Sequence, residues 1–481
     1  MRRLNFSVFR KGLHFSLVAP VAALWLTVAI VAQAQPVIQS VLYNFAGQPD
    51  GASPYGPVVL GSNHALYGTT KSGGPSGYGT VFKVNRDGTG YLVLHSFTNS
   101  PDGANPYAGL IQASDGMLYG TTYAGGAYGF GMVFKIGPFG SDYTIIHSFT
   151  NNPDGARPYA ALMQGNDGAL YGTTYVGGAN NYGAAFRINL DGGGFQILHT
   201  FTNSPDGANP VGRLLQASDG MIYGTTEAGG DGVSPLGTVF KMSTNGSDYA
   251  VLHSFNFGGS DGILPEAGLI QGSDGALYGT AANARFSGGG SSGFGTIFMI
   301  NTNGGGFTVL HSFAGNPDGS IPFGELAQGV GNVLYGTTYS GGTMDHGTVF
   351  KINPDGGGYN VLFNFGLSSG ASPYSGLVQG PSSDTNGVLY GTTFTGGAQN
   401  TSGGTVFALI VNPALSIMPV TSQTASNQTA IFWPAWALNY TLQSSTNLTS
   451  TNWVNVTTGV PVTGVQVTST NSSVFYRLVA P

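Results

Sequence analysis

The stretch Leu118-Tyr119-Gly120-Thr121-Thr122 decides the fold, because its Tyr-Gly-Thr core recurs along the chain at intervals of 52 to 57 residues. The tyrosines of the seven copies are Tyr67, Tyr119, Tyr171, Tyr223, Tyr278, Tyr335 and Tyr390. A repeat period near 50 residues is typical of arrays and propellers. We therefore divide the chain into seven repeat units.

Each unit contains four short apolar segments separated by turn residues. In the second unit, residues 109–112 and 117–122 flank an Asp115-Gly116 turn, and residues 132–136 and 143–149 follow a glycine-rich loop. Alternating or continuous apolar residues over such lengths are typical of buried strands. Four antiparallel strands repeated seven times predict an all-β fold, a seven-bladed β-propeller.

The two ends of the repeat array predict how the ring closes. The array begins with a lone strand of the fourth type, Val41 to Phe45, and the seventh copy stops after its third strand, Thr405 to Ile410. We expect the N-terminal strand to complete the last blade, which leaves no long open sheet edge. An open solenoid is the alternative, but it would leave an unpaired strand at each end and would need polar caps.

Several phrases of the repeat resemble a known family. Leu94-His95-Ser96-Phe97, Pro101-Asp102-Gly103-Ala104 and Val133-Phe134-Lys135-Ile136 are similar to the GloVer tandem repeat of bacterial secreted, "choice-of-anchor" proteins. The resemblance covers about residues 41 to 411. It implies an exported protein of poorly defined function whose relatives end in differing anchoring tails, and it brings no catalytic residues.

The first 34 residues have the pattern of a signal peptide. Basic residues precede an apolar run from Leu17 to Ala32, and Ala32-Gln33-Ala34 matches a small-x-small cleavage site. A retained anchor is disfavoured because the run is shorter than the roughly 18 residues that a spanning helix needs. We expect a secreted, extracellular or cell-surface protein, with the periplasm as an alternative, and no membrane span after cleavage before Gln35.

Composition excludes several classes of protein. The chain has no cysteine, which removes disulfide scaffolds, zinc ribbons and cysteine nucleophiles. Loss of the four basic residues of the signal peptide would take the formal net charge from −6 to −10. Such an acidic chain disfavours a nucleic-acid partner. We expect a monomer without cofactors.

Residues 35–412 form the predicted propeller, and residues 413–481 differ in composition. This tail has one charged residue, Arg477, and is rich in Thr, Ser, Asn and Val. Six candidate strands predict a small fibronectin III/Ig-like β-sandwich: Leu415 to Val420, Thr429 to Trp433, Tyr440 to Ser444, Trp453 to Thr457, Val465 to Ser469 and Val474 to Val479. Without acids or histidines, the tail suits a spacer or attachment role rather than acid/base chemistry.

Three repeated polar positions have structural explanations. Asp50, Asp102, Asp154, Asp206, Asp261 and Asp318 are expected to form turns, with calcium binding as the alternative. His95, His147, His199, His253 and His311 are expected to fill a packing slot, because copies one and seven have Tyr43 and Phe363 there. Gln112, Gln164, Gln216, Gln271, Gln328 and Gln379 should bond backbone groups beside the channel. We predict no metal site.

Deviations from the repeat supply the candidate ligand site. Arg213, Glu266 and Glu325 fall at the starts of innermost strands in consecutive blades four, five and six, on the face that carries the long loops. Ligands usually bind among such loops. The candidate ligand-binding residues are Arg213, Glu266, Glu325, Asp345, His346, Tyr107, Tyr159 and Phe323. Glu227 and Asp231 lie in nearby loops, and Tyr55 and Tyr374 extend the incomplete aromatic ring.

Two classes of function fit this pattern. The first is a non-catalytic secreted propeller that binds a glycan or an extracellular protein through its long-loop face. The second is a glycan-cleaving enzyme that uses Glu266 and Glu325 as acid and base, with Arg213 tuning the site or binding a carboxylate. We favour the first, with no catalytic residues assigned, because the chain has no nucleophile elbow, metal cluster or phosphate loop.

Overall fold

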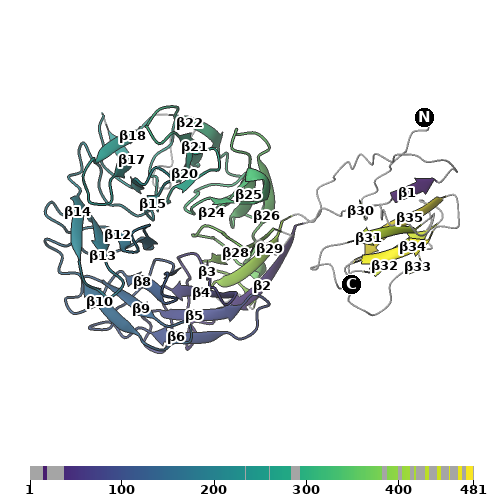
Figure 1. Ribbon diagram of the computed structural model, residues 1–481, viewed down its shortest axis with the longest axis horizontal. Helices are drawn as coiled ribbons and strands as arrows, with labels where there is room; N and C mark the ends of the chain where they lie inside the picture. Colours follow the sequence, from purple (N-terminus) through teal and green to yellow (C-terminus); the bar gives the residue numbers. More distant parts are fainter. Residues whose placement is uncertain are drawn as a thin grey trace. The chain divides into compact units, whose positions relative to one another are not determined.

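The computed structural model describes residues 37–411 apart from 233, 259, 283–292, 382–386 and 399–402, together with residues 15–18 and six short strands between 417 and 479. Residues 37–411 form seven four-stranded antiparallel sheets arranged in a ring (Figure 1). The predicted seven-bladed β-propeller is confirmed. Most of the predicted signal peptide, and the boundary predicted at residues 412 and 413, lie outside the described residues.

The strands follow the chain from the inside of each blade to the outside. Blades one to three consist of β3 (Val59–Leu60), β4 (Ala65–Thr70), β5 (Thr80–Asn85), β6 (Leu92–Ser96); β7 (Ile111–Gln112), β8 (Leu118–Thr122), β9 (Met132–Ile136), β10 (Thr144–Ser148); and β11 (Met163–Gln164), β12 (Leu170–Thr174), β13 (Ala184–Ile188), β14 (Gln196–Thr200).

The remaining blades repeat this order. Blades four to six consist of β15 (Leu215–Gln216), β16 (Ile222–Thr226), β17 (Pro235–Met242), β18 (Ala250–Asn256); β19 (Ile270–Gln271), β20 (Leu277–Ala281), β21 (Thr296–Ile300), β22 (Thr308–Ser312); and β23 (Ala327–Gln328), β24 (Leu334–Thr338), β25 (Thr348–Ile352), β26 (Asn360–Asn364). Blade seven contains β27 (Val378–Gln379), β28 (Val388–Thr393) and β29 (Thr405–Ile410). Two 3-10 turns are η1 (Val330–Asn332) and η2 (Leu367–Ser369).

The N-terminal strand closes the ring. β2 (Ile38–Asn44) lies against β29, and the seventh sheet has the order β2-β29-β28-β27 (Figure 1). The predicted closure is therefore confirmed, with a strand that begins three residues earlier than expected. Phe45, directly after β2, is fully buried and belongs to a cluster that joins blades seven and one.

The repeat sequence is explained by packing between neighbouring blades. In one apolar cluster, side chains of blade one, including Tyr67, Val81 and Phe97, contact Leu118 and Phe134 of blade two. The glycine of each Tyr-Gly-Thr core makes room for the next strand's phenylalanine, since a Cβ at Gly120 would lie 2.6 Å from Phe134 Cζ. Because these clusters span two blades, each blade depends on its neighbours for its apolar core.

A backbone arrangement that we call the junction latch repeats at all seven blade junctions. Between blades one and two, Asn105 has a left-handed φ of 54° and donates its N–H to Tyr78 O of the preceding blade. Its own carbonyl accepts from Tyr123 N. The following Pro106 packs on Gly79, where a Cβ would lie 2.8 Å from Pro106 Cδ. The other left-handed residues are Ser53, Arg157, Asn209, Leu264, Ile321 and Ser372.

The described strands between residues 417 and 479, together with one at residues 15–18, belong to a second compact unit. They form a three-stranded sheet with the order β30-β31-β34 and a four-stranded sheet with the order β1-β35-β32-β33. These strands are β1 (Phe15–Val18), β30 (Ile417–Met418), β31 (Gln428–Phe432), β32 (Thr441–Ser445), β33 (Val454–Asn455), β34 (Gly464–Thr468) and β35 (Ser473–Val479). Each of the six strands predicted in this tail overlaps one of these; the fibronectin III-like assignment stays a prediction.

β1 lies inside the segment predicted as signal peptide, and it pairs with β35. Among the described residues, no helix is long and apolar enough to cross a membrane.

The latch that closes the ring can be tested with two glycines of nearly equal φ. Gly404 and Gly116 have φ values of 85° and 81°, so Gly→Ala costs similar backbone strain at both. Only at Gly404 would the new Cβ meet other atoms, 2.2 Å from Thr393 O and 2.8 Å from Pro54 Cδ, whereas nothing lies within 4 Å at Gly116. Gly404→Ala should therefore lower the free energy of unfolding by about 1–3 kcal/mol more than Gly116→Ala, measured by urea denaturation. Equal losses would contradict the close packing of Gly404 against Thr393 and Pro54.

Candidate functional site

Seven equivalent triplets, one from each blade, line a pocket on the propeller axis. The triplets are Tyr55-Gly56-Pro57, Tyr107-Ala108-Gly109, Tyr159-Ala160-Ala161, Val211-Gly212-Arg213, Glu266-Ala267-Gly268, Phe323-Gly324-Glu325 and Tyr374-Ser375-Gly376. Each follows the proline of a junction latch. The repeat itself fixes several of the middle residues, because Thr69 Oγ1 donates to Ala108 O at 2.7 Å and Thr225 Oγ1 donates to Ala267 O at 2.8 Å.

The first residues of the triplets form an aromatic cluster over blades six, seven, one, two and three. Tyr374 stacks on Phe323 with ring centroids 4.3 Å apart, and its ring lies 3.9 Å from that of Tyr55. Tyr159 stacks on Tyr107 at 4.8 Å and its hydroxyl donates to the Tyr55 hydroxyl. The aromatic side chains of blades one, three and seven therefore contact one another.

A second cavity of about 340 Å³ lies beside this cluster, and we call it the axial vestibule. It shares Tyr107, Tyr159, Val211, Glu266, Phe323 and Tyr374 with the pocket described above and adds Tyr123, Tyr175 and Glu227. The three added residues directly follow the Thr-Thr of their repeats, at the start of the long loops. The vestibule therefore opens among the long loops, and Tyr55, which lines only the first pocket, lies beneath it.

Two acidic side chains contribute to the wall of the vestibule. Glu227 is 4% exposed, and Glu266 is half-buried and lines both cavities. Burial, together with the charge of Glu266, raises the pKa of Tyr374 to about 12. Burial is also the main cause that raises the pKa of Tyr159. Both hydroxyls stay protonated at neutral pH; the Tyr159 hydroxyl donates its hydrogen bond to Tyr55, and the Tyr374 hydroxyl can donate to a ligand.

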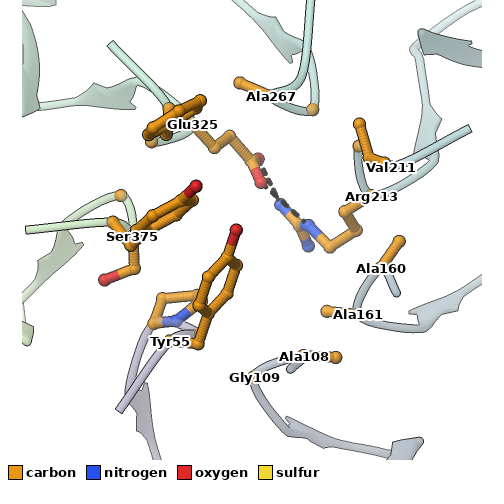
Figure 2. Close-up of a pocket in the computed structure, with 18 of the residues that line it drawn as sticks. Tyr55, Ala108, Gly109, Ala160, Ala161, Val211, Arg213, Ala267, Glu325 and Ser375 are labelled. Atoms are coloured by element: carbon orange, nitrogen blue, oxygen red, sulfur yellow. Dashed lines mark hydrogen bonds and ion pairs between the residues drawn. The ribbon is translucent and has the colours of Figure 1, made fainter. Parts of the chain in front are cut away.

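Arg213 and Glu325 form an ion pair in the deeper pocket. Arg213 Nη2 lies 2.6 Å from Glu325 Oε1, and Arg213 Nε donates to Glu325 Oε2 at 3.2 Å (Figure 2). The charge of Glu325 raises the pKa of the Arg213 guanidinium. The pair links blades four and six and passes Gly268 of blade five, where a Cβ would lie 3.2 Å from Glu325 Oε2. Bidentate pairs of this kind are geometrically specific.

The structure brings together six of the eight predicted ligand-binding residues. Arg213, Glu266, Glu325, Tyr107, Tyr159 and Phe323 all line the axial pocket. Asp345 and His346 line neither cavity. Asp345 is exposed and its Oδ1 accepts from Gly341 N at 2.9 Å, so this carboxylate stabilises its own loop. His346 contributes its carbonyl to a junction latch by accepting from Ser372 N.

Tyr123 and Tyr175 were missed at the sequence level. They occupy the position after Thr-Thr, which is also Lys71, Glu227, Tyr339 and Phe394 in other blades. The sequence signal that could have identified them is that four of the seven copies of this position are aromatic.

The repeated histidines and aspartates turn out to be partners. His95 Nε2 lies 3.0 Å from Asp102 Oδ1, and Asp102 also accepts from Thr98 N at 2.9 Å. The His95 ring stacks on Tyr143 of the next blade at 3.7 Å, and Tyr143 Oη donates to Asp102 O. The same His–Asp pair occurs at His147–Asp154, His199–Asp206, His253–Asp261 and His311–Asp318. The packing slot is confirmed; the aspartate carboxylate bonds the N–H four residues before it and the histidine ring, so the two positions form one junction.

The glutamines also join blades. Gln164 Oε1 accepts from Ser114 N of the preceding blade, and Gln164 Nε2 donates to Gly168 O, both at 2.9 Å. Gln112, Gln216 and Gln271 make equivalent pairs of bonds. Over the described part of the chain, no three His, Asp or Glu side chains gather closely enough to hold a metal ion.

The repeat sequence matches a known family. A model of the Gloeobacter/Verrucomicrobia repeat matches residues 31–233 and 212–429. The chain belongs to this family. The match spans the whole propeller of this Gloeobacter/Verrucomicrobia repeat protein, in agreement with the resemblance of its repeat phrases. No curated protein matches the chain.

Solved propellers resemble this family member only distantly. An oligogalacturonate lyase in complex with manganese is 10% identical, with a TM-score of 0.49 over 79% of this chain and 98% of that chain. A GH74 xyloglucanase from Xanthomonas campestris is 13% identical, with a TM-score of 0.49 over 82% of this chain and 60% of that one. A putative 6-phosphogluconolactonase from Bacteroides uniformis is 14% identical, with a TM-score of 0.46 over 84% and 98%. Likeness at this level says nothing about activity or substrate.

The His–Asp junctions predict how stability depends on pH. Burial lowers the pKa of His95, His147 and His199, although the neighbouring aspartates act against this shift. As the pH falls below the unfolded value of about 6.5, the unfolded chain binds protons first, so the free energy of unfolding decreases. In the first copy of the repeat, Tyr43 takes the place of the histidine and does not titrate in this range. It makes the same two contacts, because its hydroxyl donates to Asp50 at 2.7 Å and its ring stacks on Tyr91 at 3.6 Å.

The triple variant His95→Tyr, His147→Tyr, His199→Tyr should therefore lose less stability than wild type as the pH is lowered from 7 to 5. Urea denaturation at several pH values measures the slope. An unchanged slope would show that these histidines do not control the acid response.

Proposed function

We propose that this protein is an exported, non-catalytic binding protein whose axial vestibule holds a saccharide. The observation that carries the proposal is the composition of the vestibule wall, which has five tyrosines, one phenylalanine and two glutamates among its nine residues. Clefts with aromatic walls and a few placed polar groups are characteristic of small-ligand sites.

Aromatic rings and sugars are chemically matched. The C–H groups on one face of a pyranose pack on the face of an aromatic ring, while its hydroxyls need hydrogen-bond partners around the edge. The half-buried Tyr159 and Tyr374 offer a ring and a protonated hydroxyl, which are an apolar body with a polar tip. The carboxylates of Glu227 and Glu266 are strong acceptors for sugar hydroxyls. Together these groups meet both needs of a saccharide.

The ion pair in the deeper pocket favours binding over cleavage. A glycosidase needs two carboxyl groups that can exchange protons with, or attack, the substrate. Both carboxylate oxygens of Glu325 accept hydrogen bonds from Arg213. The guanidinium thus occupies one acceptor position on each oxygen and fixes the carboxylate in a bidentate pair, which would have to open before Glu325 could exchange a proton freely with a substrate. For this reason Glu266 and Glu325 are weak candidates for an acid and base pair.

The proposed location follows from the two ends of the chain. The predicted signal peptide would export the protein, and the tail from residue 413 would act as a spacer that presents the propeller at the cell surface or in the extracellular space. A secreted binding protein of this kind would capture a polysaccharide or its fragments outside the cell.

Retention of the mature protein, residues 35–481, on an array of neutral, acidic and amino-sugar polysaccharides tests the proposal. Tyr374→Ala removes an aromatic side chain that lines both cavities and should weaken retention about tenfold, because such a group contributes about 1–2 kcal/mol to binding. Tyr128→Ala is the matched control, since Tyr128 is 62% exposed on the β8–β9 loop and lines neither cavity.

Tyr374→Phe keeps the ring and loses only the hydroxyl, so it separates the contribution of the ring to binding from that of the hydroxyl. Melting temperatures of all variants complete the comparison. Retention of no glycan by wild type, or equal retention by wild type and Tyr374→Ala, would contradict the proposal. Release of shortened sugars from a retained polysaccharide would favour the enzyme instead.

A further inference from the structure

We infer that the axial vestibule binds the end of a saccharide chain and not an internal stretch. This inference rests on the proposed function, which identifies the ligand as a saccharide, and it follows from the shape of the cavity. A site for internal segments is a groove with two open ends, so that the polymer can enter on one side and leave on the other.

The vestibule is enclosed around its circumference. Its nine lining residues come from blades two to seven; the first of them along the chain is Tyr107 in blade two, and the last is Tyr374 in blade seven. Blade one closes the remaining side through Lys71. The Lys71 ammonium lies 4.7 Å from the ring centroid of Tyr107 and 5.9 Å from that of Phe394, which belong to the two blades on either side. The described side chains thus surround the axis on every side.

The vestibule is also narrowed below. The Tyr159 hydroxyl donates to Tyr55, and the Tyr55 ring lies 3.9 Å from that of Tyr374. Tyr55 lines only the deeper pocket, whereas Tyr159 and Tyr374 line both cavities, so this group lies where the two cavities meet. In the deeper pocket the Arg213–Glu325 pair joins blades four and six (Figure 2). Both groups narrow the axial path that a polymer would have to follow.

The size of the vestibule agrees with a short ligand segment. Its volume of about 340 Å³ lies at the lower end of the range of ligand pockets, roughly 300–1,000 Å³. The stacked pairs Phe323–Tyr374 and Tyr107–Tyr159 both line it. A terminal sugar can pack against the outer ring of either pair, while the rest of the chain leaves along the axis into solvent.

End recognition predicts a dependence on the number of chains. If only chain ends bind, the inhibitory potency of a polysaccharide is proportional to the number of its ends. Breaking the polysaccharide into shorter pieces then increases its potency per unit mass. If internal segments bind, the same treatment leaves the potency per unit mass unchanged or lowers it.

The experiment uses the mature wild-type protein and each polysaccharide that the array retains, intact and after partial hydrolysis to about one tenth of its mean chain length. Each preparation competes with the immobilised intact polysaccharide for the protein. We expect the half-inhibitory mass concentration to fall about tenfold on hydrolysis, because the number of ends rises about tenfold. Tyr128→Ala should reproduce the wild-type ratio, and Tyr374→Phe should keep the ratio even where the affinity changes.

Equal potency per unit mass before and after hydrolysis would overturn end recognition and leave the proposed function standing. Failure of every glycan to be retained would overturn the proposed function and this inference with it. Reduction of the reducing ends with borohydride then distinguishes the two ends, since only a protein that reads the reducing end loses affinity for the reduced chains.

Discussion

The junction latch is the constraint on which the rest of the structure depends. At each junction, a residue with φ between 54° and 60° donates its N–H to the preceding blade, and the proline after it packs on a glycine of that blade. Leu264 and Ile321 adopt this conformation, which is uncommon for residues with a Cβ and unfavourable for a β-branched side chain such as that of Ile321. The surrounding packing must therefore enforce it. Because the next three residues form the axial triplet, the device that joins the blades also positions the site.

This arrangement separates the scaffold from the site. In blades two, five and seven the middle residue of the triplet, Ala108, Ala267 or Ser375, is bound through its carbonyl to a threonine of the preceding blade, so the repeat holds the backbone in place. The side chains at the first and third positions face the axis and are free to differ between blades. Blade four carries Arg213 at the position where blade six carries Glu325. Their ion pair fits because blade five has a glycine, Gly268, at the same position, so no side chain of blade five lies in its way. The asymmetry of the site thus comes from a symmetric frame.

Much of this fold could be predicted from the sequence, because the repeat states the same local pattern seven times. The blade count, the closing strand and the bonding of glutamines such as Gln164 to backbone groups all followed from repetition. Pairing between residues far apart in the chain did not follow. The Arg213–Glu325 pair joins blades that are not adjacent, and its geometry depends on how far each side chain reaches across the axis. Asp345 was expected beside the site but lines neither cavity, because loop position alone does not tell whether a carboxylate faces the site or bonds its own loop.

The central claim is that the axial vestibule holds a saccharide, and a crystal structure of the protein with a retained oligosaccharide tests it most directly. The account predicts one sugar ring stacked against Phe323 and Tyr374 or against Tyr107 and Tyr159, with the remaining units leaving along the propeller axis. A sugar bound instead at the outer rim, in the groove lined by Tyr43, Tyr91 and Leu92, with the vestibule empty, would contradict it.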